Sequence, residues 1–166
     1  MISEEYRRMN QVLHENPAYG NSATRWVPYI SYMRGNTVLD YGCGKGKIAR
    51  KANFPIDEYD PAIPGKDTLP EPHQCVICTD VMEHIEPEYL DAVLEHIQSL
   101  MLEAGFFVIS TKAAKKVLPD GRNAHLIIKP AVWWMDKLSD YFFVRTLHKN
   151  VTQDCEAVFL VEARDD

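Results

Sequence analysis

The sequence predicts an α/β fold, with helices on both faces of a doubly wound, mostly parallel sheet. Three observations support this prediction. Short apolar runs typical of buried strands alternate with segments whose apolar residues recur at helical spacing. The first strand leads into a turn with glycine at every second position, at Gly42, Gly44 and Gly46. Two further strands close the chain without a helix between them, which predicts an antiparallel last strand.

Length and composition limit the possible classes of protein. The chain has 166 residues, enough for a single domain with a hydrophobic core. Apolar residues make up 46% and charged residues 25%, as in ordinary globular proteins. The formal net charge of −6 disfavours broad binding to nucleic acid or to an anionic membrane, although docking of one nucleotide stays possible.

The chain carries no pattern of a secreted or membrane protein. Its first residues are polar and charged, unlike a signal peptide, and no apolar run approaches the roughly 20 residues that cross a bilayer. The four cysteines do not have the spacing of a disulfide framework. We therefore expect a cytoplasmic protein with no membrane attachment. These features predict no particular oligomeric state.

Residues 1–34 are predicted to form a helical lid over a core made by residues 35–166. The lid would contain an amphipathic helix over 3–14 and a second helix over 23–33, in which Pro28 limits where the helix starts. Its inward-facing residues would be Trp26, Ile30 and Met33.

The helices and strands of the core are predicted from the spacing of apolar residues, which differs between helices and strands. Strands are predicted over 37–40, 55–59, 74–79, 106–110, 142–147 and 157–162. Helices are predicted over 45–52, 87–102 and 131–140. Gly105 would end the second of these helices. Inward positions on the third would include Val132, Trp133 and Leu138. The proline-rich segment 61–72 is predicted to be a loop.

The glycine turn indicates which ligand it suits. A dinucleotide fingerprint requires a third glycine at the position of Lys47, and a P-loop requires a Lys-Ser/Thr pair that is absent. Asp40 instead precedes the first glycine by two residues. A carboxylate there would repel a pyrophosphate but suit a ligand with positive charge. A turn without side chains would also let that ligand lie against backbone N–H groups.

The segment from Val38 to Gly46 closely resembles the first motif of the class I S-adenosylmethionine-dependent methyltransferases. Asp60 matches their acidic residue after the second strand, which binds the ribose hydroxyls. The segment from Cys78 to Ile85 is similar to the family's Asp-Val-Leu-Glu-His-Ile segment. The resemblance covers about three quarters of the chain and implies a Rossmann-like fold with S-adenosyl-L-methionine as cofactor.

The resemblance implies a set of cofactor-binding residues: Tyr19, Asp40, Tyr41, Gly42, Cys43, Gly44, Asp60, Pro61, Asp80 and Val81. Each acidic member also has a purely structural alternative. Asp40 could cap a strand end, Asp60 could form a turn before Pro61, and Asp80 could be the N-cap of a short helical turn.

The chain departs from the family between Asp60 and Asp80, where the segment is too short for the usual helix and edge strand. We therefore expect about six strands, with the third lost or reduced. A second, weaker resemblance, to small phage-type members of the superfamily, rests on the Tyr19-Gly20 loop, Trp26 and the segment 118–126.

Two histidines are candidates for catalysis. His125 follows a glycine-containing loop after a core strand, where it could act as a base or bind the substrate. His84 would lie at the mouth of the same cleft and is the second candidate; packing of the helix is its alternative role. Arg122 could bind an anionic substrate group or be a solvated loop charge.

No metal site is expected. His73, Cys75 and Cys78 have a spacing that invites a metal interpretation. On a strand, however, residues three apart point to opposite faces, so two buried apolar cysteines are favoured instead.

These patterns predict a methyltransferase that acts on an oxygen or nitrogen atom of a small molecule or nucleotide-type substrate. The sequence lacks the Asn/Asp-Pro-Pro-Tyr segment of amino-group methylases and the Pro-Cys segment of cytosine-C5 methylases. Methylation of phage DNA or RNA, and non-catalytic binding of S-adenosylmethionine, stay as alternatives. A nicotinamide oxidoreductase is disfavoured by Lys47.

Overall fold

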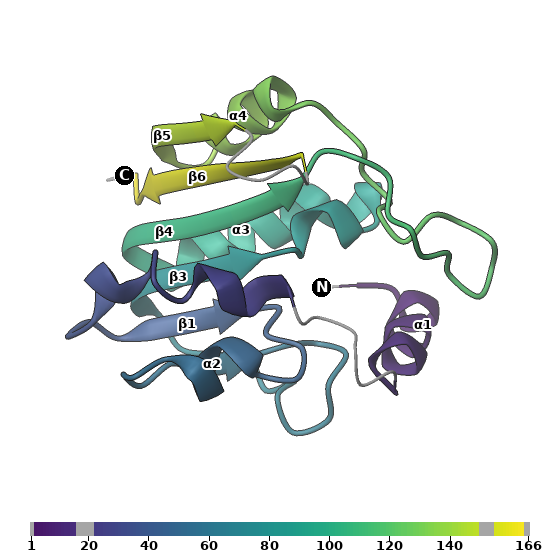
Figure 1. The fold of residues 1–166 in the computed structure, drawn as a ribbon, viewed down its shortest axis with the longest axis horizontal. Coiled ribbons are helices and arrows are strands. Elements are labelled where there is room, and N and C mark those ends of the chain that lie inside the picture. Colours follow the sequence, from purple (N-terminus) through teal and green to yellow (C-terminus); the bar gives the residue numbers. More distant parts are fainter. Residues whose placement is uncertain (1, 16–21, 150–154, 165–166) are drawn as a thin grey trace.

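The computed structural model describes residues 2–15, 22–149 and 155–164, which form one six-stranded sheet covered by helices (Figure 1). The strands are β1 (Val38–Tyr41), β2 (Asp57–Tyr59), β3 (His73–Thr79), β4 (Met101–Ser110), β5 (Phe143–Lys149) and β6 (Glu156–Glu162). The helices are α1 (Glu4–Glu15), α2 (Lys47–Lys51), α3 (Leu90–Leu100) and α4 (Ala131–Ser139). Short 3₁₀ helices are η1 (Ser22–Trp26), η2 (Ser31–Met33), η3 (Met82–His84) and η4 (Pro87–Tyr89).

The strand order is β2-β1-β3-β4-β6-β5. The first four strands of this order pair in parallel, and β6 is antiparallel to both β4 and β5. The predicted doubly wound sheet with an antiparallel last strand is therefore confirmed. Residues 60–72 form no strand, so the three-residue β2 is the edge of the sheet and the expected loss of the third strand is also confirmed.

Two apolar layers cover the sheet, one on each face. Alternate residues of the central strands enter different layers, as the period of two requires. On β3, Cys78 packs with the cluster that contains Leu94 and Trp134, from α3 and α4. Cys75 packs with the opposite cluster, which contains Trp26 and Ile48. The two cysteines thus lie on opposite faces, as predicted.

The sheet also explains where a site forms. In Figure 1, α1 and the long loop after β4 lie side by side beyond the carboxyl ends of the parallel strands. A small third apolar cluster joins them, formed by Tyr6 and Met9 of α1 with Leu118 and Ala124 of the loop. In open α/β sheets this end of the strands is where ligands bind.

Three predictions about elements were wrong in detail. The helix expected over 23–33 is two short 3₁₀ helices, η1 and η2, because Pro28 has no N–H to donate between them. Trp26, Ile30 and Met33 are nevertheless buried, as expected.

Gly105 does not end a helix: α3 ends at Leu100 and Gly105 lies inside β4. A Cβ atom there would come within 2.8 Å of Met101 Sδ and Val161 Cγ2, so packing excludes any side chain. On α4, Trp134 and Leu138 are buried and Trp133 is partly buried, as expected for a pair with one tryptophan in the core. Val132, also predicted as a helical apolar position, is exposed. In the described part of the chain, no helix is long and apolar enough to cross a membrane.

Candidate active site

The glycine turn joins β1 to α2 through left-handed backbone. Gly42, Gly44 and Gly46 have φ of 78°, 51° and 68°, values that residues with a side chain rarely adopt. The alternation of glycine in the sequence therefore has a direct conformational cause.

The turn uses its N–H groups internally. The amides of Gly42 and Cys43 both donate to the carbonyl oxygen of Tyr59, at 2.8 and 3.1 Å. The amide of Gly44 donates to Asp60 Oδ2 at 2.8 Å, and that of Gly46 donates to the carbonyl oxygen of Cys43 at 2.9 Å. The expectation that these N–H groups face a ligand is therefore wrong for this structure. These four amides are therefore not available to bind a phosphate.

Gly42 also brings two distant segments into contact. A Cβ atom at this position would lie 2.5 Å from Cγ2 of Val81, the residue just after β3. Only glycine allows β1 and the chain after β3 to approach so closely. The two segments that resemble methyltransferase motifs are thus packed directly against each other.

A cavity of about 530 Å³ opens beside this contact, at the carboxyl ends of β1, β3 and β4. It is lined by both candidate histidines and by every predicted cofactor-binding residue that the structure describes: Asp40, Tyr41, Gly42, Cys43, Gly44, Asp60, Pro61, Asp80, Val81, His84 and His125. Arg122 does not line it. Tyr19 lies outside the described residues. The fold therefore brings these residues together from separate parts of the sequence.

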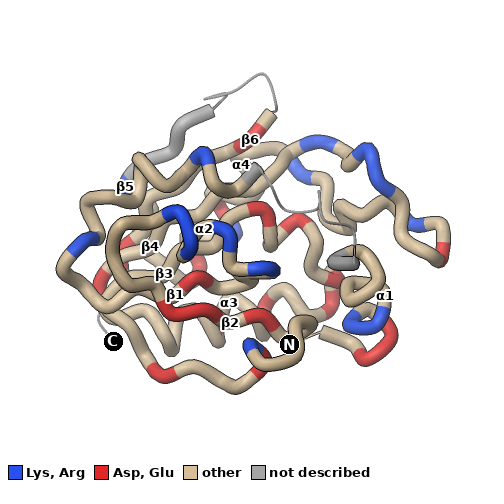
Figure 2. Tube along the Cα trace, turned by 60° about the horizontal axis from the view of Figure 1, so that its bottom comes forward, with Lys and Arg blue, Asp and Glu red and all other residues tan. Residues whose placement is uncertain are grey.

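One end of the cavity is acidic. Asp40 at the carboxyl end of β1 is only 2% exposed, and its Oδ2 atom has no hydrogen-bond partner among the described residues. Burial, with further repulsion from Glu58 and Asp60, raises the pKa of Asp40 to about 8. Figure 2 shows the acidic positions gathered between the sheet and α1. This end of the cavity favours a ligand that brings positive charge or N–H donors.

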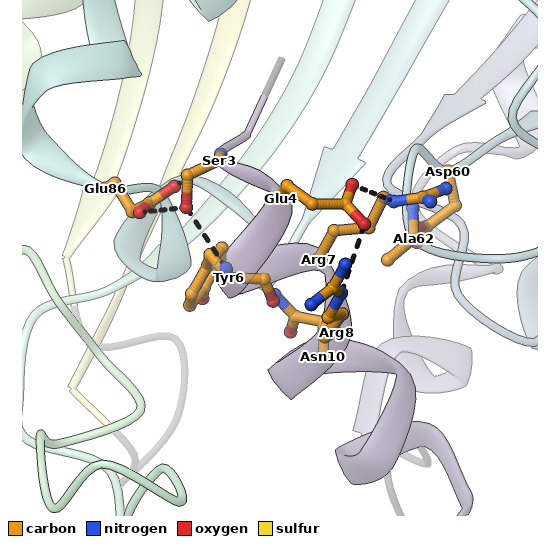
Figure 3. A network of polar contacts seen from close by, with 9 residues as sticks. All are labelled: Ser3, Glu4, Tyr6, Arg7, Arg8, Asn10, Asp60, Ala62 and Glu86. Atoms are coloured by element: carbon orange, nitrogen blue, oxygen red, sulfur yellow. Dashed lines mark hydrogen bonds and ion pairs between the residues drawn. The ribbon is translucent and has the colours of Figure 1, made fainter.

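Asp60 holds the turns around it. Its Oδ2 atom accepts the amide of Gly44 at 2.8 Å. Its Oδ1 atom accepts the amide of Ala62 at 2.9 Å, and these two residues are labelled in Figure 3. Each oxygen retains a second lone pair for a hydroxyl donor. Asp60 therefore fixes the glycine turn relative to the loop after β2, whatever else it binds.

Asp80 has strained backbone at the end of β3. Its φ of 56° places a non-glycine residue in the left-handed region, and its amide donates to the carbonyl oxygen of Val108 at 3.0 Å. Such strain often accompanies functional sites. Here it turns the chain from β3 into η3, which brings Glu83 and His84 to the cavity end of the sheet.

The two histidines meet at the other end of the cavity. The ring centroids of His84 and His125 are 4.7 Å apart and their planes are almost perpendicular, at 88°. His84 Nδ1 lies 2.7 Å from the carbonyl oxygen of Ala124, and His125 Nδ1 lies 2.6 Å from that of Lys112. Both rings are thus held in fixed orientations by the loop after β4.

Sequence reasoning missed Glu83 as a site residue. The side chain is fully buried; Oε1 accepts the amide of Ser110 at 3.0 Å, and Oε2 has no hydrogen-bond partner among the described residues. Burial, with repulsion from Asp80, raises the pKa of Glu83 well above its ordinary range. The available signal was its position beside His84, directly after a buried strand.

Several charged residues line the cavity, although the sequence did not place Arg25 or Glu156 there and indicated only a solvated basic run at residues 112–116. Arg25 of η1 forms an ion pair with Glu156, at the start of β6. Lys112, Lys115 and Lys116 line the rim on the loop after β4. In Figure 2, basic positions are concentrated above α1. The cavity therefore combines an acidic floor with a basic rim.

The first helix covers the cavity through a defined anchor. The amide and Oγ of Ser3 donate to the two carboxylate oxygens of Glu86, at 2.8 and 2.7 Å (Figure 3). Ser3 Oγ also accepts the amide of Tyr6 at 3.1 Å, as an N-cap does. Tyr6 is buried and lines the cavity.

A family model described as a methyltransferase domain matches residues 4–149. The chain belongs to this methyltransferase family. The resemblance to class I S-adenosylmethionine-dependent methyltransferases is thereby confirmed, with S-adenosylmethionine as the cofactor of the family. No curated protein sequence matches the methyltransferase.

Solved structures share the fold of this methyltransferase at low sequence identity. The 1,6-didemethyltoxoflavin N1-methyltransferase of Burkholderia thailandensis, with bound 1,6-didemethyltoxoflavin and S-adenosylhomocysteine, has a TM-score of 0.68 at 15% identity, over 97% of this chain and 90% of that chain. The magnesium protoporphyrin IX methyltransferase of Synechocystis PCC 6803, with bound S-adenosylhomocysteine, has a TM-score of 0.57 at 17% identity. The match covers 96% of this chain and 86% of that chain.

The residues that line the cavity are compatible with a cofactor that carries a sulfonium group. The unpartnered Oδ2 of Asp40 offers an acceptor to a cationic group, and Gly42 and Gly44 line the cavity together with Asp40. The internally bonded amides of the turn argue against a phosphate at the same place. The residues present are therefore compatible with S-adenosylmethionine.

Proposed function

We propose that this methyltransferase transfers a methyl group to an oxygen or nitrogen atom of a small molecule or nucleotide-type substrate. One observation supports this proposal above the others: a single cavity has an acidic end at Asp40 and a histidine end at His84 and His125. An acidic end suits a cationic methyl donor, and a histidine end suits an acceptor that must lose a proton.

S-adenosylmethionine, when bound, supplies an electrophilic methyl group on a sulfonium, so the protein's main tasks are alignment and exclusion of water. We assign cofactor binding to Asp40, Asp60 and Asp80, together with the turn residues 41–44 and Pro61 and Val81. Val81 and Gly42 would fix the floor of the site by their close contact. Tyr19, which lies outside the described residues, is retained in this proposal.

We assign the acceptor end to His125, with His84 as the second candidate. A carbonyl oxygen can only accept a hydrogen bond, so Nδ1 of each ring donates to its carbonyl partner. In a neutral ring the lone pair is then on Nε2, which is the atom able to take a proton from the acceptor. The fixed ring orientation favours one position for that acceptor.

The size of the substrate follows from what covers the cavity. Residues 1–34 and the loop 111–129 are proposed to act as the lid, because α1 and the loop pack together through Tyr6 and Leu118. Two structural neighbours are methyltransferases of small molecules, 1,6-didemethyltoxoflavin and magnesium protoporphyrin IX. The rim lysines Lys112, Lys115 and Lys116 favour a substrate with an anionic group.

Methylation of DNA or RNA is the weaker alternative. It would require a continuous basic surface from Lys112 to Lys129. Arg122 is instead paired with Asp120, at 2.6 Å, and Lys129 lies over the ring of Trp133 beside a separate hollow. These contacts argue against such a continuous surface, and the net charge of −6 opposes binding to a long phosphate backbone.

Calorimetric titration tests the cofactor half of the proposal. We expect binding of S-adenosylmethionine and S-adenosylhomocysteine and no binding of NAD. Asp40→Ala and Asp60→Ala should each weaken binding of S-adenosylmethionine by roughly 1–3 kcal/mol, the cost of a lost charge-assisted hydrogen bond. Asp136→Ala, at an exposed position on α4, is the control.

The acceptor half is tested by methyl transfer to panels of small molecules, nucleotides and oligonucleotides, read by mass spectrometry. Turnover should fall strongly in His125→Ala while cofactor affinity is retained. Normal cofactor binding by both aspartate variants would refute the site assignment. Cofactor binding without any transfer would favour a binding protein.

A further inference from the structure

Three metal-ligating side chains converge at the histidine end of the cavity. One carboxylate oxygen of Glu83 and one ring nitrogen each of His84 and His125 lie within 4.8 Å of one another. They come from two segments, because Glu83 and His84 belong to η3 and His125 to the loop after β4. The distance is short enough for one ion to contact all three atoms after small side-chain movements.

Both imidazoles make the kind of hydrogen bond that metal-binding histidines usually make. Each ring donates its Nδ1–H to a backbone carbonyl oxygen, of Ala124 for His84 and of Lys112 for His125. Such a hydrogen bond fixes the tautomer, orients the ring and makes the other nitrogen a better ligand. Nε2 of each neutral ring therefore carries the lone pair that a cation would use.

Glu83 provides the second, independent observation. The side chain is completely buried, yet its Oε2 atom has no hydrogen-bond partner among the described residues. A buried carboxyl oxygen without a partner is costly, and a bound cation would remove that cost. The carboxyl group is also held in place, because Oε1 accepts the amide of Ser110.

The backbone ties the two ligand-bearing segments together. The amide of Ile127 donates to the carbonyl oxygen of Glu83 at 3.0 Å, and His84 bonds to Ala124. These contacts hold η3 against the loop on both sides of His125. The fold therefore holds the two ligand-bearing segments together before any ion binds, so that only small side-chain movements are needed to bind it.

We propose that Glu83, His84 and His125 form a binding site for one divalent transition-metal ion, of the zinc, manganese, iron or cobalt class. Two imidazoles and one carboxylate suit these ions, whereas magnesium and calcium prefer oxygen ligands alone. Three protein ligands leave further positions of the ion open to the cavity. The site is distinct from the acidic end at Asp40, which we assign to the cofactor.

The metal site refines the substrate class, a step that rests on the proposed function. An acceptor with an oxygen donor, such as a hydroxyl group, would fill an open position of the ion. The positive charge would lower the pKa of that hydroxyl, so that it releases its proton to solvent water. His84 and His125 would then act through the ion, because an Nε2 lone pair cannot bind a metal and a proton together.

The test is a titration of untagged protein, stripped with a chelator and exchanged into metal-free buffer. Calorimetry with Zn²⁺ and with Mg²⁺ should give one Zn²⁺ per chain, bound at least about 100-fold more tightly than Mg²⁺. Co²⁺ should bind to the same site and give visible absorption bands typical of a protein-bound ion. Zn²⁺ should displace it and abolish these bands.

Matched variants locate the ion. Glu83→Gln and His125→Gln should each weaken Zn²⁺ binding by about tenfold or more, as loss of one ligand does. His73→Gln is the control, because His73 pairs with the carboxylate of Asp57 at the opposite end of β3 and does not line the cavity. Thermal melting of every variant checks that the fold is retained.

Two outcomes would overturn the metal site: no stoichiometric Zn²⁺ binding by the wild-type protein, or unchanged affinity in folded Glu83→Gln and His125→Gln proteins. Titration with S-adenosylmethionine on the same samples separates the two proposals. If the wild-type protein binds Zn²⁺ but does not bind S-adenosylmethionine, the proposed function is refuted and the metal site is not. Intact cofactor binding without Zn²⁺ binding would refute the metal site and leave the histidines as bases.

Discussion

The carboxyl group of Asp40 is buried beside other acidic side chains, so its ionisation opposes folding. Burial raises its pKa to about 8 in the folded protein, whereas an unfolded aspartate has a pKa of about 3.9. Between these values the folded state binds more protons than the unfolded state. The stability of the protein without ligand should therefore fall as the pH rises, and the loss should be complete above about pH 8.

This linkage gives a measurable pH dependence. Between pH 7 and pH 9, ionisation of Asp40 should lower the free energy of unfolding by about 1 kcal/mol, which is roughly 2–4 °C in melting temperature for a chain of this size. Asp40→Asn keeps the shape of the side chain and should remove this part of the decline. If the melting temperatures of the wild-type and variant proteins fall equally between pH 7 and pH 9, the assignment to Asp40 is wrong.

At the level of elements, the contact between the glycine turn and the chain after β3 has no room for a methyl group. Gly42→Ala should lower stability by roughly 1–3 kcal/mol more than Gly65→Ala does. Both glycines have φ near 80°, at 78° and 85°, but only Gly42 faces a side chain, that of Val81. The free energies of unfolding in urea are measured for both variants. Because the backbone strain is similar at the two sites, their difference reports the steric clash with Val81.

Combining Gly42→Ala with Val81→Ala should recover part of that loss, since the double change removes the colliding methyl groups. Additive losses in the double variant would show that the contact is not the cause.

The N-terminal helix depends on one serine. Ser3→Ala removes both the N-cap of α1 and the hydrogen bond to Glu86, and should cost about 1 kcal/mol. We expect faster hydrogen exchange in α1 and in the loop after β4, with unchanged exchange in the sheet. Ser99→Ala, which removes an exposed hydrogen bond on α3, is the matched control. Exchange that accelerates equally in the central strands would indicate global destabilisation instead.

The sequence predicted the elements whose signals are local. The alternation of Gly42, Gly44 and Gly46 correctly located the turn, and the apolar run before Asp80 correctly located β3. The assignment of Gly105 to a helix end failed because a glycine looks the same in a strand, where the nearby Met101 and Val161 side chains exclude a Cβ atom.

Parts of the site that depend on tertiary structure could not be predicted. The sequence cannot show that Glu83 is buried with one oxygen unpartnered, or that His125 of a remote loop reaches His84. These relations arise only when η3 and the loop after β4 pack together. Strand periodicity correctly placed Cys75 and Cys78 on opposite faces of the sheet, but this local reasoning gave no sign of the cluster at Glu83, His84 and His125.

For the whole molecule, cofactor binding should be visible as stabilisation. A ligand that binds only the folded state at 100 times its dissociation constant adds about 2.7 kcal/mol. For a chain of this length the melting temperature should then rise by roughly 5–11 °C. S-adenosylmethionine and S-adenosylhomocysteine should each produce this shift in a thermal melt. NAD at equal concentration is the comparison, and an equal shift with NAD would contradict the cofactor assignment.

The four cysteines differ in ways that make the molecule easy to label. Cys75 and Cys78 are buried in the two core layers, and burial raises the pKa of the Cys43 thiol, which keeps it in the unreactive protonated form. Cys155 alone among the four is exposed, and it directly precedes Glu156 at the edge of the cavity. A thiol-reactive fluorophore would therefore attach mainly at Cys155, next to a residue that lines the cavity. The native chain thus carries its own attachment point for an optical sensor of ligand binding.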